Sequence, residues 1–390
     1  MGVRNRDEGR HYGRADLESF RSQSRFDGTD VAHLEQRGLL MNTFDEISSR
    51  VPVRCGIVLA GGNGKRLAPF IRQMRADDLP KQYVNLTGSR SMLEHTFYRA
   101  EKLISPERLF TVVGRNHLKY PEAQRQLLAR PEGTIVVQPE NKETGPGLLL
   151  PLMHLYKRYP TSTVAVFPSD HFIVEEDLFM LHVHRAFRIV QQDASRLVLL
   201  GVEPNAPEPE YGYIMPEKKR QDLLASGDAC EVSQFIEKPE RCVVHELILQ
   251  GGLWNTMVMV FKVDTLLNAV YKAAPQLHDF FQKIGKAIGT SSAAEVVERT
   301  YKAMWPMNLS REVLEVISRQ KPSPLWVLPV RGVRWSDWGS KRRIEDSLKE
   351  TERRVQKEAR KPARKPARKM VKDGRQDAVG KGLLWPTKQN

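Results

Sequence analysis

Residues Cys55 to Tyr83 read CGIVLAGGNGKRLAPFIRQMRADDLPKQY. Their first part, Cys55–Ala60, is an apolar run long enough for one buried strand. A glycine-rich turn, Gly61-Gly62-Asn63-Gly64, follows this run without a gap. Glycine lets backbone N–H groups approach a ligand closely, and successive N–H groups in a tight loop bind anions. The stretch therefore predicts a buried strand that ends in an anion-binding turn.

Three cations accompany this turn, a number that suits a triphosphate. Lys65 and Arg66 follow the last glycine, and Lys81 comes after a proline. Two common phosphate loops are excluded, because a Walker A loop needs glycine at position 59, where the chain has Leu59, and the dinucleotide fingerprint needs a small residue where the chain has Leu67. On local sequence alone, a structural glycine turn between a strand and a helix remains the alternative.

The order Gly-Gly-x-Gly-x-Arg-Leu-x-Pro, followed by Leu-Pro-Lys-Gln, resembles the signature of the sugar-1-phosphate nucleotidylyltransferases. The Pro-Lys-Gln form is most similar to that of the mannose-1-phosphate guanylyltransferases. The resemblance continues to about residue 350, so it covers roughly 300 of the 390 residues. It implies that Arg66 and Lys81 act in catalysis. The nucleotide-binding residues that it implies are Leu59, Ala60, Gly61, Gly62, Gly64, Lys65, Gln138, Glu140 and Thr144.

The distribution of charge separates three parts of the chain. The formal net charge is +14, of which residues 351–390 carry +9, residues 1–50 carry −1 and the remaining residues carry +6. We therefore expect an N-terminal extension over residues 1–50, partly disordered, one catalytic domain over residues 51–350, and a disordered basic tail over residues 351–390. The tail holds one aromatic residue, Trp385, so we expect it to bind polyanions without sequence specificity rather than a specific nucleic acid.

The sequence also bears on location and on further domains. The three cysteines, Cys55, Cys230 and Cys242, form no metal-binding pattern, which fits a reducing, cytoplasmic setting. An apolar leader and a membrane-length apolar run are absent from the sequence, so we expect neither a standard secretion signal nor a membrane span. We expect no acetyltransferase domain, because hexapeptide repeats are absent, and no fused isomerase domain.

Strand and helix patterns alternate after residue 54. This rhythm predicts an α/β fold of Rossmann-like type, with a mostly parallel sheet and helices on both faces. The expected strands are Gly56–Ala60, Leu109–Val113, Thr134–Val137, Thr163–Phe167 and Leu197–Gly201, and the expected helices are Met92–Leu103, Pro121–Leu128, Gly147–Tyr159 and Leu178–Gln191. Such sheets bind ligands at the carboxyl ends of their strands, so the glycine turn and Pro168-Ser169-Asp170-His171 should open onto one crevice.

A second region, from Tyr211 to Phe261, predicts a small mixed α+β lobe that binds the acceptor. Its expected strands are Tyr211–Met215, Glu231–Ile236 and Thr256–Phe261, with a helix near Arg241–Leu249. Residues 264–320 read as helices with Asp264 and Ser310 as N-caps, Pro324–Val330 reads as a strand, and a final helix begins near Ser340.

Two aspartates are candidate ligands for Mg²⁺, which prefers oxygen donors from one or two carboxylates plus substrate phosphates. Asp170, in Pro-Ser-Asp-His, matches the short Asp-His motif of the resembled family, which also gives this residue a catalytic role. Asp337, in Trp-Ser-Asp-Trp-Gly, resembles the family's late Trp-x-Asp-x-Gly motif. The alternatives are an N-cap for Asp170 and a tryptophan-rich packing turn for Asp337. The two carboxylates meet only if the late segment returns to the crevice.

Three short segments resemble the family's sugar-phosphate site. Gly212 lies in a Tyr-Gly-Tyr-Ile strand, Glu237-Lys238 in Phe-Ile-Glu-Lys-Pro, and Asn255 in Trp-Asn-Thr. The resemblance implies that Gly212 lets the sugar approach the backbone, that Glu237 and Asn255 contact the sugar, and that Lys238 binds its phosphate. Taken alone, Glu237-Lys238 is more often a solvated surface pair.

The base remains open at this stage. Guanylyltransferases usually read Arg-Asn-Thr-Ala-Pro where this chain reads Lys142-Glu143-Thr144-Gly145-Pro146. His171, His182 and His184 are interpreted as ordinary residues, because His182 and His184 would not share a helix face and a third ligand is not evident.

The resemblance implies transfer of a nucleotidyl group from GTP to mannose 1-phosphate with Mg²⁺, giving GDP-mannose and pyrophosphate. Another base and sugar pair, such as UTP or dTTP with glucose 1-phosphate, remains open, as do a catalytically idle homologue that binds nucleotide-sugars and an RNA- or membrane-associated role for the basic tail. Intact catalytic and metal positions argue against the idle homologue. A homodimer is compatible with the sequence, which leaves the oligomeric state open.

Overall fold

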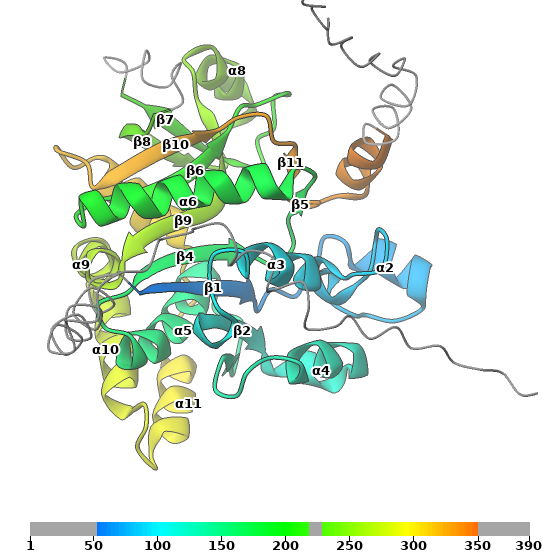
Figure 1. Ribbon diagram of the computed structural model, residues 1–390, viewed down its shortest axis with the longest axis vertical. Helices are drawn as coiled ribbons and strands as arrows, with labels where there is room; N and C mark the ends of the chain where they lie inside the picture. Colours follow the sequence, from blue (N-terminus) through cyan, green and yellow to red (C-terminus); the bar gives the residue numbers. More distant parts are fainter. Residues whose placement is uncertain (1–52, 218–227, 350–390) are drawn as a thin grey trace, which may run out of the picture.

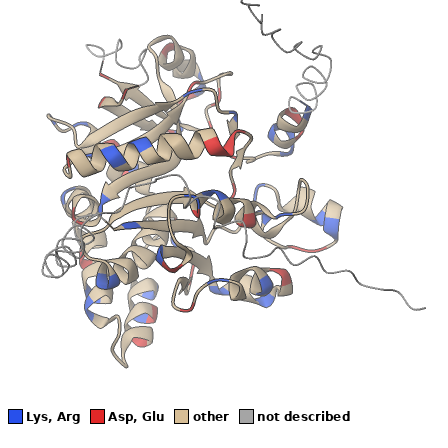
Figure 2. Ribbon diagram, viewed as in Figure 1, with Lys and Arg blue, Asp and Glu red and all other residues tan. Residues whose placement is uncertain are grey.

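The computed structural model describes residues 53–217 and 228–349. The predicted N-terminal extension and basic tail lie outside the described residues, so their boundaries stay predictions. Among the described residues, basic and acidic residues are mixed along the helices (Figure 2). The described part contains no helix that is both long and apolar enough to cross a membrane.

Nine strands of the described chain form one sheet, in the order β3-β2-β1-β4-β9-β6-β10-β8-β7. Strands β1, β2, β3 and β4 are parallel neighbours, and β10 is parallel to β6. Strand β9 runs antiparallel between β4 and β6. The strands are β1 (Arg54–Ala60), β2 (Leu109–Gly114), β3 (Ile135–Gln138), β4 (Thr163–Pro168), β6 (Leu197–Val202), β7 (Gly212–Pro216), β8 (Cys230–Glu237), β9 (Leu253–Lys262) and β10 (Leu325–Val330). The mostly parallel α/β sheet is confirmed.

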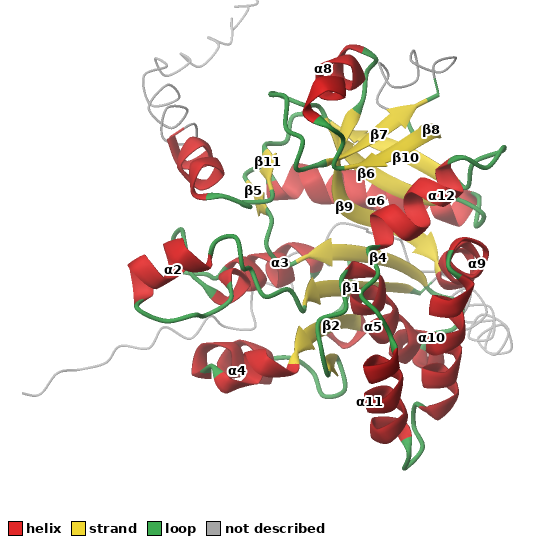
Figure 3. Ribbon diagram, turned by 180° about the vertical axis from the view of Figure 1, so that it is seen from behind, coloured by secondary structure: helices red, strands yellow, loops and turns green. Residues whose placement is uncertain are grey.

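Helices cover both faces of this sheet. Helices α3 and α6 lie on the face turned to the viewer in Figure 1, and α5, α10 and α11 cover the opposite face, seen in Figure 3. The helix bounds are α2 (Ala68–Arg75), α3 (Met92–Ala100), α4 (Pro121–Leu128), α5 (Thr144–Arg158), α6 (Glu176–Gln192), α8 (Arg241–Leu249), α9 (Val263–Ala273), α10 (Pro275–Ala287), α11 (Ala293–Ala303) and α12 (Glu315–Ser318). A further helix spans residues 341–349.

The central strand β1 shows how the sequence builds two cores. Its residues Cys55 and Ile57 are fully buried on the face covered by α5 and α10, and Val58 and Ala60 are fully buried on the face covered by α3 and α6. Successive side chains of a strand point to opposite faces, so a strand buried on both faces reads as a continuous apolar run. The apolar run in the sequence follows from this position.

The strands of the predicted acceptor lobe are continuous with the main sheet. Strands β7 and β8 do not form a separate sheet, because β8 pairs with β10 and β7 pairs with both β8 and β9. These pairings join the lobe to the main sheet, with α8 as its helix. The acceptor segments and the crevice are therefore built on the same sheet.

Two predicted helix caps are wrong. Helix α9 begins after Lys262, so Asp264 lies in its first turn rather than at its N-cap. Ser310 lies inside a π-helical turn, Ser310–Leu314, and the side chain of Asn308 accepts a hydrogen bond from Arg311 N at 3.1 Å. The side-chain oxygen of Asn308 thus caps this helical segment, the role predicted for Ser310.

Candidate active site

The glycine turn is held in place through its backbone carbonyl groups. Gln82 Nε2 donates to the carbonyl oxygens of Ala60 and Gly62, both at 2.9 Å, and Gln138 Nε2 donates to that of Gly61 at 3.3 Å. A Cβ atom at Gly61 would lie 2.4 Å from Gln138 Nε2, so this contact requires glycine. Gly64 has a φ of +61°, a conformation that glycine adopts without strain. Contacts within the protein therefore fix the shape of the turn.

Lys81 connects the two halves of the site. Its Nζ lies 2.9 Å from Asp170 Oδ2 and donates to the backbone carbonyls of Asp337, at 2.9 Å, and Trp338, at 3.3 Å. The lysine side chain is 7% exposed, whereas the Asp170 side chain is 34% exposed. Burial opposes ionisation of Asp170, but the Lys81 ammonium and the neighbouring His171 together hold the pKa of this carboxyl below its ordinary value.

Asp337 reaches the crevice because the late segment does return to it. Strand β11 (Trp335–Ser336) pairs with β5 (Phe172–Ile173), which follows Asp170 closely. The neighbouring Trp338 is buried and stacks on Phe172, with ring centroids 4.3 Å apart. The two aspartates, far apart in sequence, therefore both lie next to Lys81.

Asp337 is heavily hydrogen-bonded. Its Oδ1 accepts from Tyr211 Oη at 3.0 Å, Gly339 N at 2.9 Å and Arg343 Nη1 at 2.8 Å. Burial opposes ionisation of this carboxyl, but Arg343 and Lys81 hold its pKa below its ordinary value. Arg66 Nη2 lies 3.6 Å from Oδ2, and Arg66 Nη1 pairs with Glu210 at 3.1 Å.

His171 lies in the site, although the sequence was interpreted otherwise. It is buried beside Asp170, and its Nδ1 accepts a hydrogen bond from Trp335 Nε1 at 3.2 Å. Burial lowers its pKa to about 4, so the ring is neutral at physiological pH. His182 and His184 fit the interpretation as ordinary residues, because they lie on α6 outside the cleft, with His182 contacting the carbonyl of Arg331.

The acceptor residues converge from three strands. A Cβ at Gly212 would lie 2.8 Å from Glu237 Oε2 and 3.4 Å from Asn255 Cβ, so glycine permits their close packing. Lys238 Nζ lies 3.7 Å from Glu237 Oε1. Burial raises the pKa of Glu237, and Lys238 opposes this effect. The buried Asn255 accepts from Met257 N at 2.9 Å through Oδ1.

Backbone strain gathers around the same site. Four non-glycine residues there have positive φ: Glu143 (70°), Lys238 (51°), Met257 (54°) and Trp338 (43°). Such conformations cost on the order of 1–3 kcal/mol each and persist where the surrounding structure fixes them, commonly at active sites. The first three line the cleft, and the fourth follows Asp337.

Most of the predicted residues line two adjoining cavities, which together form a cleft at the carboxyl ends of β1 and β4. One part, a cavity of about 340 Å³, is lined by Leu59, Gly61, Gly62, Arg66, Gln138, Thr144, Asp170, Glu237, Lys238 and Asp337 among others. An adjoining cavity of about 460 Å³ shares Arg66 and Asp170 and adds Gly64, Lys65 and Lys81. The cleft therefore places the phosphate turn, both aspartates and the acceptor lysine around one volume.

Four predicted residues do not line the cleft. Ala60 is buried beneath the turn, and Glu140 is exposed and pairs with Lys142 at 3.0 Å. Gly212 and Asn255 lie behind Glu237 and Met257. Thr144 does line it, but its Oγ1 already accepts from Leu309 N at 2.9 Å.

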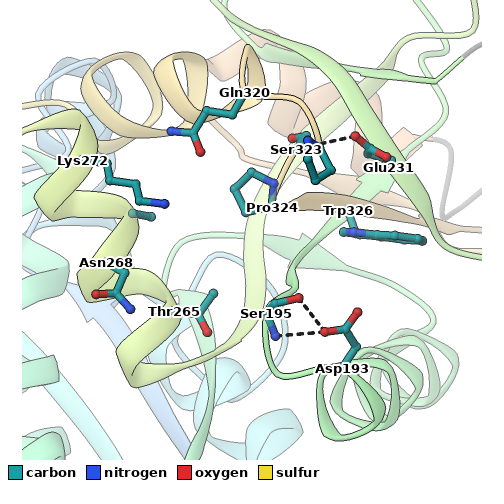
Figure 4. Close-up of a pocket in the computed structure, with 12 residues that line it drawn as sticks. Asp193, Ser195, Glu231, Thr265, Asn268, Lys272, Gln320, Ser323, Pro324 and Trp326 are labelled. Carbon is teal, nitrogen blue, oxygen red and sulfur yellow. Dashed lines mark hydrogen bonds between the residues drawn. The ribbon is translucent and has the colours of Figure 1, made fainter.

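A separate cavity of about 480 Å³ lies at the opposite edge of the sheet, near the start of β10 (Figure 4). The carboxylates that line it are hydrogen-bonded to neighbouring residues. Asp193 accepts hydrogen bonds from Ser195 Oγ and Arg196 Nε, and Glu231 accepts one from Ser323 N at 2.7 Å. The predicted site residues all lie elsewhere. We therefore place the chemistry in the cleft and not in this cavity.

The donor set of the cleft fits Mg²⁺. Asp170 contributes a partly exposed carboxylate, and Oδ2 of Asp337 is the less saturated oxygen of a second one. Hard oxygen donors from two carboxylates, completed by phosphate oxygens, are what Mg²⁺ prefers. Among the described residues, a cluster of three or more His, Cys, Asp or Glu side chains is absent, so an all-protein cage is not formed here.

Several cleft residues were missed from the sequence. His171 could have been found from its position directly after Asp170. Asn141, Glu143, Asn308 and Ser310 line the cleft without a pattern that marks them. Arg343 lies beyond the last motif, and its role becomes visible only through its contact with Asp337.

The geometry agrees with three comparisons to known proteins. The family model described as nucleotidyl transferase matches residues 55–357. The alginate biosynthesis protein AlgA of Pseudomonas syringae pv. tomato is 29% identical over 287 residues, covering 73% of this chain and 56% of that protein. The mannose-1-phosphate guanylyltransferase of Salmonella montevideo is 27% identical over 290 residues, covering 73% and 58%. The chain thus spans little more than half the length of these curated relatives.

Solved structures share the fold. A Thermus thermophilus structure titled mannose-1-phosphate geranyltransferase has a TM-score of 0.61 at 25% identity, covering 73% of this chain and 76% of that one. A Helicobacter pylori structure titled mannose-6-phosphate isomerase has a TM-score of 0.56 at 20% identity, covering 73% and 99%, which supports the fold alone. Because the family model spans most of the chain and includes both aspartates and the phosphate turn, the chain belongs to the nucleotidyl transferase family of enzymes.

Proposed function

We propose that this protein transfers a nucleotidyl group from GTP to mannose 1-phosphate, giving GDP-mannose and pyrophosphate. The single observation that carries this proposal is the composition of the cleft. The phosphate turn with Arg66 lies on one side of a cavity of about 340 Å³, and Glu237 with Lys238 lines the same cavity. Two polyanionic substrates would meet there, between cations that come from separate parts of the sheet.

The reaction asks the protein for positioning and charge neutralisation. An oxygen of the sugar phosphate attacks the α-phosphorus in line, the bond to the β-phosphate oxygen breaks, and pyrophosphate leaves with its electron pair. Lys238 binds the attacking phosphate, and the phosphate turn with Lys65 binds the triphosphate. Arg66 and Lys81 stabilise the charge that develops on the transferring and leaving phosphates. A nucleophilic side chain is not required.

Asp170 and Asp337 would hold Mg²⁺ on the phosphate side of the cleft. When bound, the ion supplies Lewis-acid neutralisation of phosphate charge. Lys81 orders both ligands at once, because it pairs with the Asp170 carboxylate and donates to the Asp337 carbonyl. The protein therefore prepares both oxygen donors before substrates bind.

Support for the guanine and mannose assignment comes from similarity to mannose-1-phosphate guanylyltransferases at 26–28% identity, which indicates a class and leaves the pair to experiment. UTP or dTTP with glucose 1-phosphate is the competing pair.

We propose a cytoplasmic location, supported by three cysteines that are all free. A specific nucleic-acid partner is not proposed. A homodimer and a polyanion-binding tail stay predictions of the sequence.

A matrix assay tests the proposed function. Purified protein is incubated with Mg²⁺, each of four nucleoside triphosphates and several hexose 1-phosphates, and released pyrophosphate is measured. We expect the highest kcat/KM for GTP with mannose 1-phosphate. A preference for another pair would correct the substrates and keep the class, whereas binding of nucleotide-sugars without turnover of any pair would identify an idle homologue.

A further inference from the structure

Asp337 presents its two oxygens unequally. Oδ1 accepts three hydrogen bonds, from Tyr211 Oη, Gly339 N and Arg343 Nη1, at 2.8 to 3.0 Å. Oδ2 accepts one hydrogen bond, from the same Arg343 nitrogen at 3.1 Å, and lies 3.6 Å from Arg66 Nη2. The first oxygen is saturated, so Oδ2 is the one available to a ligand in the cleft.

Arg343 is itself fixed from two further directions. Its Nη2 pairs with Glu208 Oε2 at 2.8 Å, and its guanidinium lies 4.5 Å from the centroid of the Tyr211 ring. The side chain is 15% exposed, on the helix of residues 341–349. Because a planar guanidinium has donors at fixed angles, one nitrogen reaches Asp337 while the other reaches Glu208, which a single ammonium does not reproduce.

The segment that carries Asp337 is locked on its other side as well. Trp338 has a φ of 43° and is buried against Phe172, and strand β11 pairs with β5. At Gly339 a Cβ would lie 2.5 Å from Asp337 Oδ2 and 2.8 Å from Arg343 Nη1, so glycine allows these groups to converge. Burial of the tryptophan holds the segment from the interior, and Arg343 holds it from the outer side.

We propose that Arg343 is a positioning residue of this site. It holds the Asp337 carboxylate in the one orientation that turns Oδ2 to the cleft, and it connects this carboxylate to Glu208, in the segment that precedes β7. The inference rests on the proposed function, in which Asp337 is a ligand of the divalent cation. It also extends the functional unit beyond Gly339, the last residue of the family-like motif, into the helix of residues 341–349.

The test compares Arg343→Gln and Arg343→Lys with a neighbouring control, Arg342→Gln. Arg342 is 90% exposed and pairs with Asp346 at 3.5 Å, so the control removes a cation from the same helix without touching Asp337. Amide hydrogen exchange over residues 335–339 is measured in the full-length protein without substrate. Steady-state kinetics with a pyrophosphate readout then separate kcat from KM for both substrates.

We expect both Arg343 variants to lower kcat by about 10- to 100-fold, the usual cost of removing a group that orients a metal ligand, with both KM values within a few-fold. Exchange over residues 335–339 should accelerate by about tenfold or more, the fold-change expected when a charged hydrogen bond is lost. Arg342→Gln should behave as wild type in both measurements. Glu208→Gln weakens the ion pair that holds Arg343 without contacting Asp337. It should lower kcat and accelerate exchange by smaller factors, and it replaces the Arg343 variants if they fail to fold.

Three outcomes would overturn the inference. Wild-type kcat in Arg343→Lys would show that a positive charge alone suffices. Wild-type amide exchange in Arg343→Gln would show that Asp337 is ordered without Arg343. Faster exchange with unchanged kcat would show that the order of this segment does not affect catalysis. Failure of the proposed function is distinguishable, because the wild-type protein would then turn over none of the substrates, while exchange would still decide whether Arg343 orders Asp337.

Discussion

Lys81 Nζ lies 2.9 Å from Asp170 Oδ2 and donates to the backbone carbonyl of Asp337 at the same distance. One buried cation thus joins the strand end that carries the first aspartate to the late segment that carries the second. Lys81→Met keeps the apolar stem and removes the charge. We expect kcat to fall on the order of 100- to 1000-fold, by analogy with the removal of one donor that acts in the transition state.

The same substitution should change the pH profile. Because Lys81 is the main group that holds the Asp170 pKa down against burial, its removal should move the acidic limb of kcat/KM to higher pH. Lys341→Met, which removes an exposed cation that pairs with Glu345, is the control. A variant with wild-type kcat and an unchanged limb would make Lys81 a structural tether only.

Arg66 and Lys238 are expected to divide their work between the two substrates. Lys238→Ala should raise KM for the sugar phosphate far more than KM for the nucleotide, by about 10- to 150-fold for a lost charged contact of roughly 1.5–3 kcal/mol. Arg66→Ala should mainly depress kcat, on the order of 100- to 1000-fold. Initial rates over a grid of both substrate concentrations give kcat and both KM values for each variant. Equal effects of both variants on both KM values and on kcat would contradict this division.

His117 makes the stability of the fold sensitive to mild acid. It is fully buried, its Nδ1 contacts Tyr83 Oη at 3.2 Å, and its Nε2 lies 3.3 Å from Asn63 Oδ1 in the phosphate turn. Burial lowers its pKa from 6.5 to about 4. Between these values the unfolded chain binds the proton and the folded one does not, so this residue's contribution to stability is lost as pH falls from 6.5 to 4.

The size of this effect is roughly 3 kcal/mol in the free energy of unfolding across that window. Urea titrations at pH 7, 6 and 5 measure it. His117→Gln should flatten the dependence on pH by up to about 1.4 kcal/mol per unit, whatever its effect at pH 7. The exposed His245→Gln is the control, and an unchanged slope in His117→Gln would assign the acid sensitivity to other groups.

The fold could be predicted largely because its strands are buried on both faces. Strand β1 contains the apolar run Cys55–Ala60 and is followed directly by glycine, so the apolar pattern and the turn residues indicate the same strand end. The pairing of β7 with β9 could not be predicted in this way, because local sequence carries no information about which distant edge a strand joins. The N-cap of α9 was predicted wrongly for a related reason. Helix α9 follows β9 directly and begins at Val263, so Asp264 is its second residue and not its N-cap.

The candidate site divides along a similar line. Residues in short motifs, such as Asp170 and Lys238, could be named from sequence and do line the cleft. Arg343 could not, because a lone arginine on a charged helix looks like solvated surface until Asp337 is placed beside it. His171 was set aside for lack of a third ligand, yet burial next to Asp170 gives it a place in the site.

The domain boundary gives a prediction about truncation. A chain ending after Glu350 retains the helix of residues 341–349 and the contact of Arg343 with Asp337. We expect its kcat/KM to stay within a few-fold of the full chain, with weaker retention on an anionic resin because residues 351–390 carry a net charge of +9. A folded but inactive truncation would show that the tail completes the site.

The two aspartates should behave as one functional unit. Both lie against Lys81, and both supply hard anionic oxygens to the same cleft. Asp170→Asn and Asp337→Asn each keep the shape of the side chain and remove its charge. We therefore expect each to nearly abolish turnover with Mg²⁺ while leaving circular dichroism and the folded state unchanged.

If both residues serve one cation, the double variant should be scarcely slower than either single variant, since residues that share a function are strongly non-additive. Mn²⁺, which also accepts oxygen ligands, should partly rescue the single variants. The decisive comparison is Asp337→Asn under saturating Mg²⁺. Near wild-type kcat there would reduce Asp337 to an anchor for Arg343 and Tyr211, and the cation would then rest on Asp170 and the substrate phosphates alone.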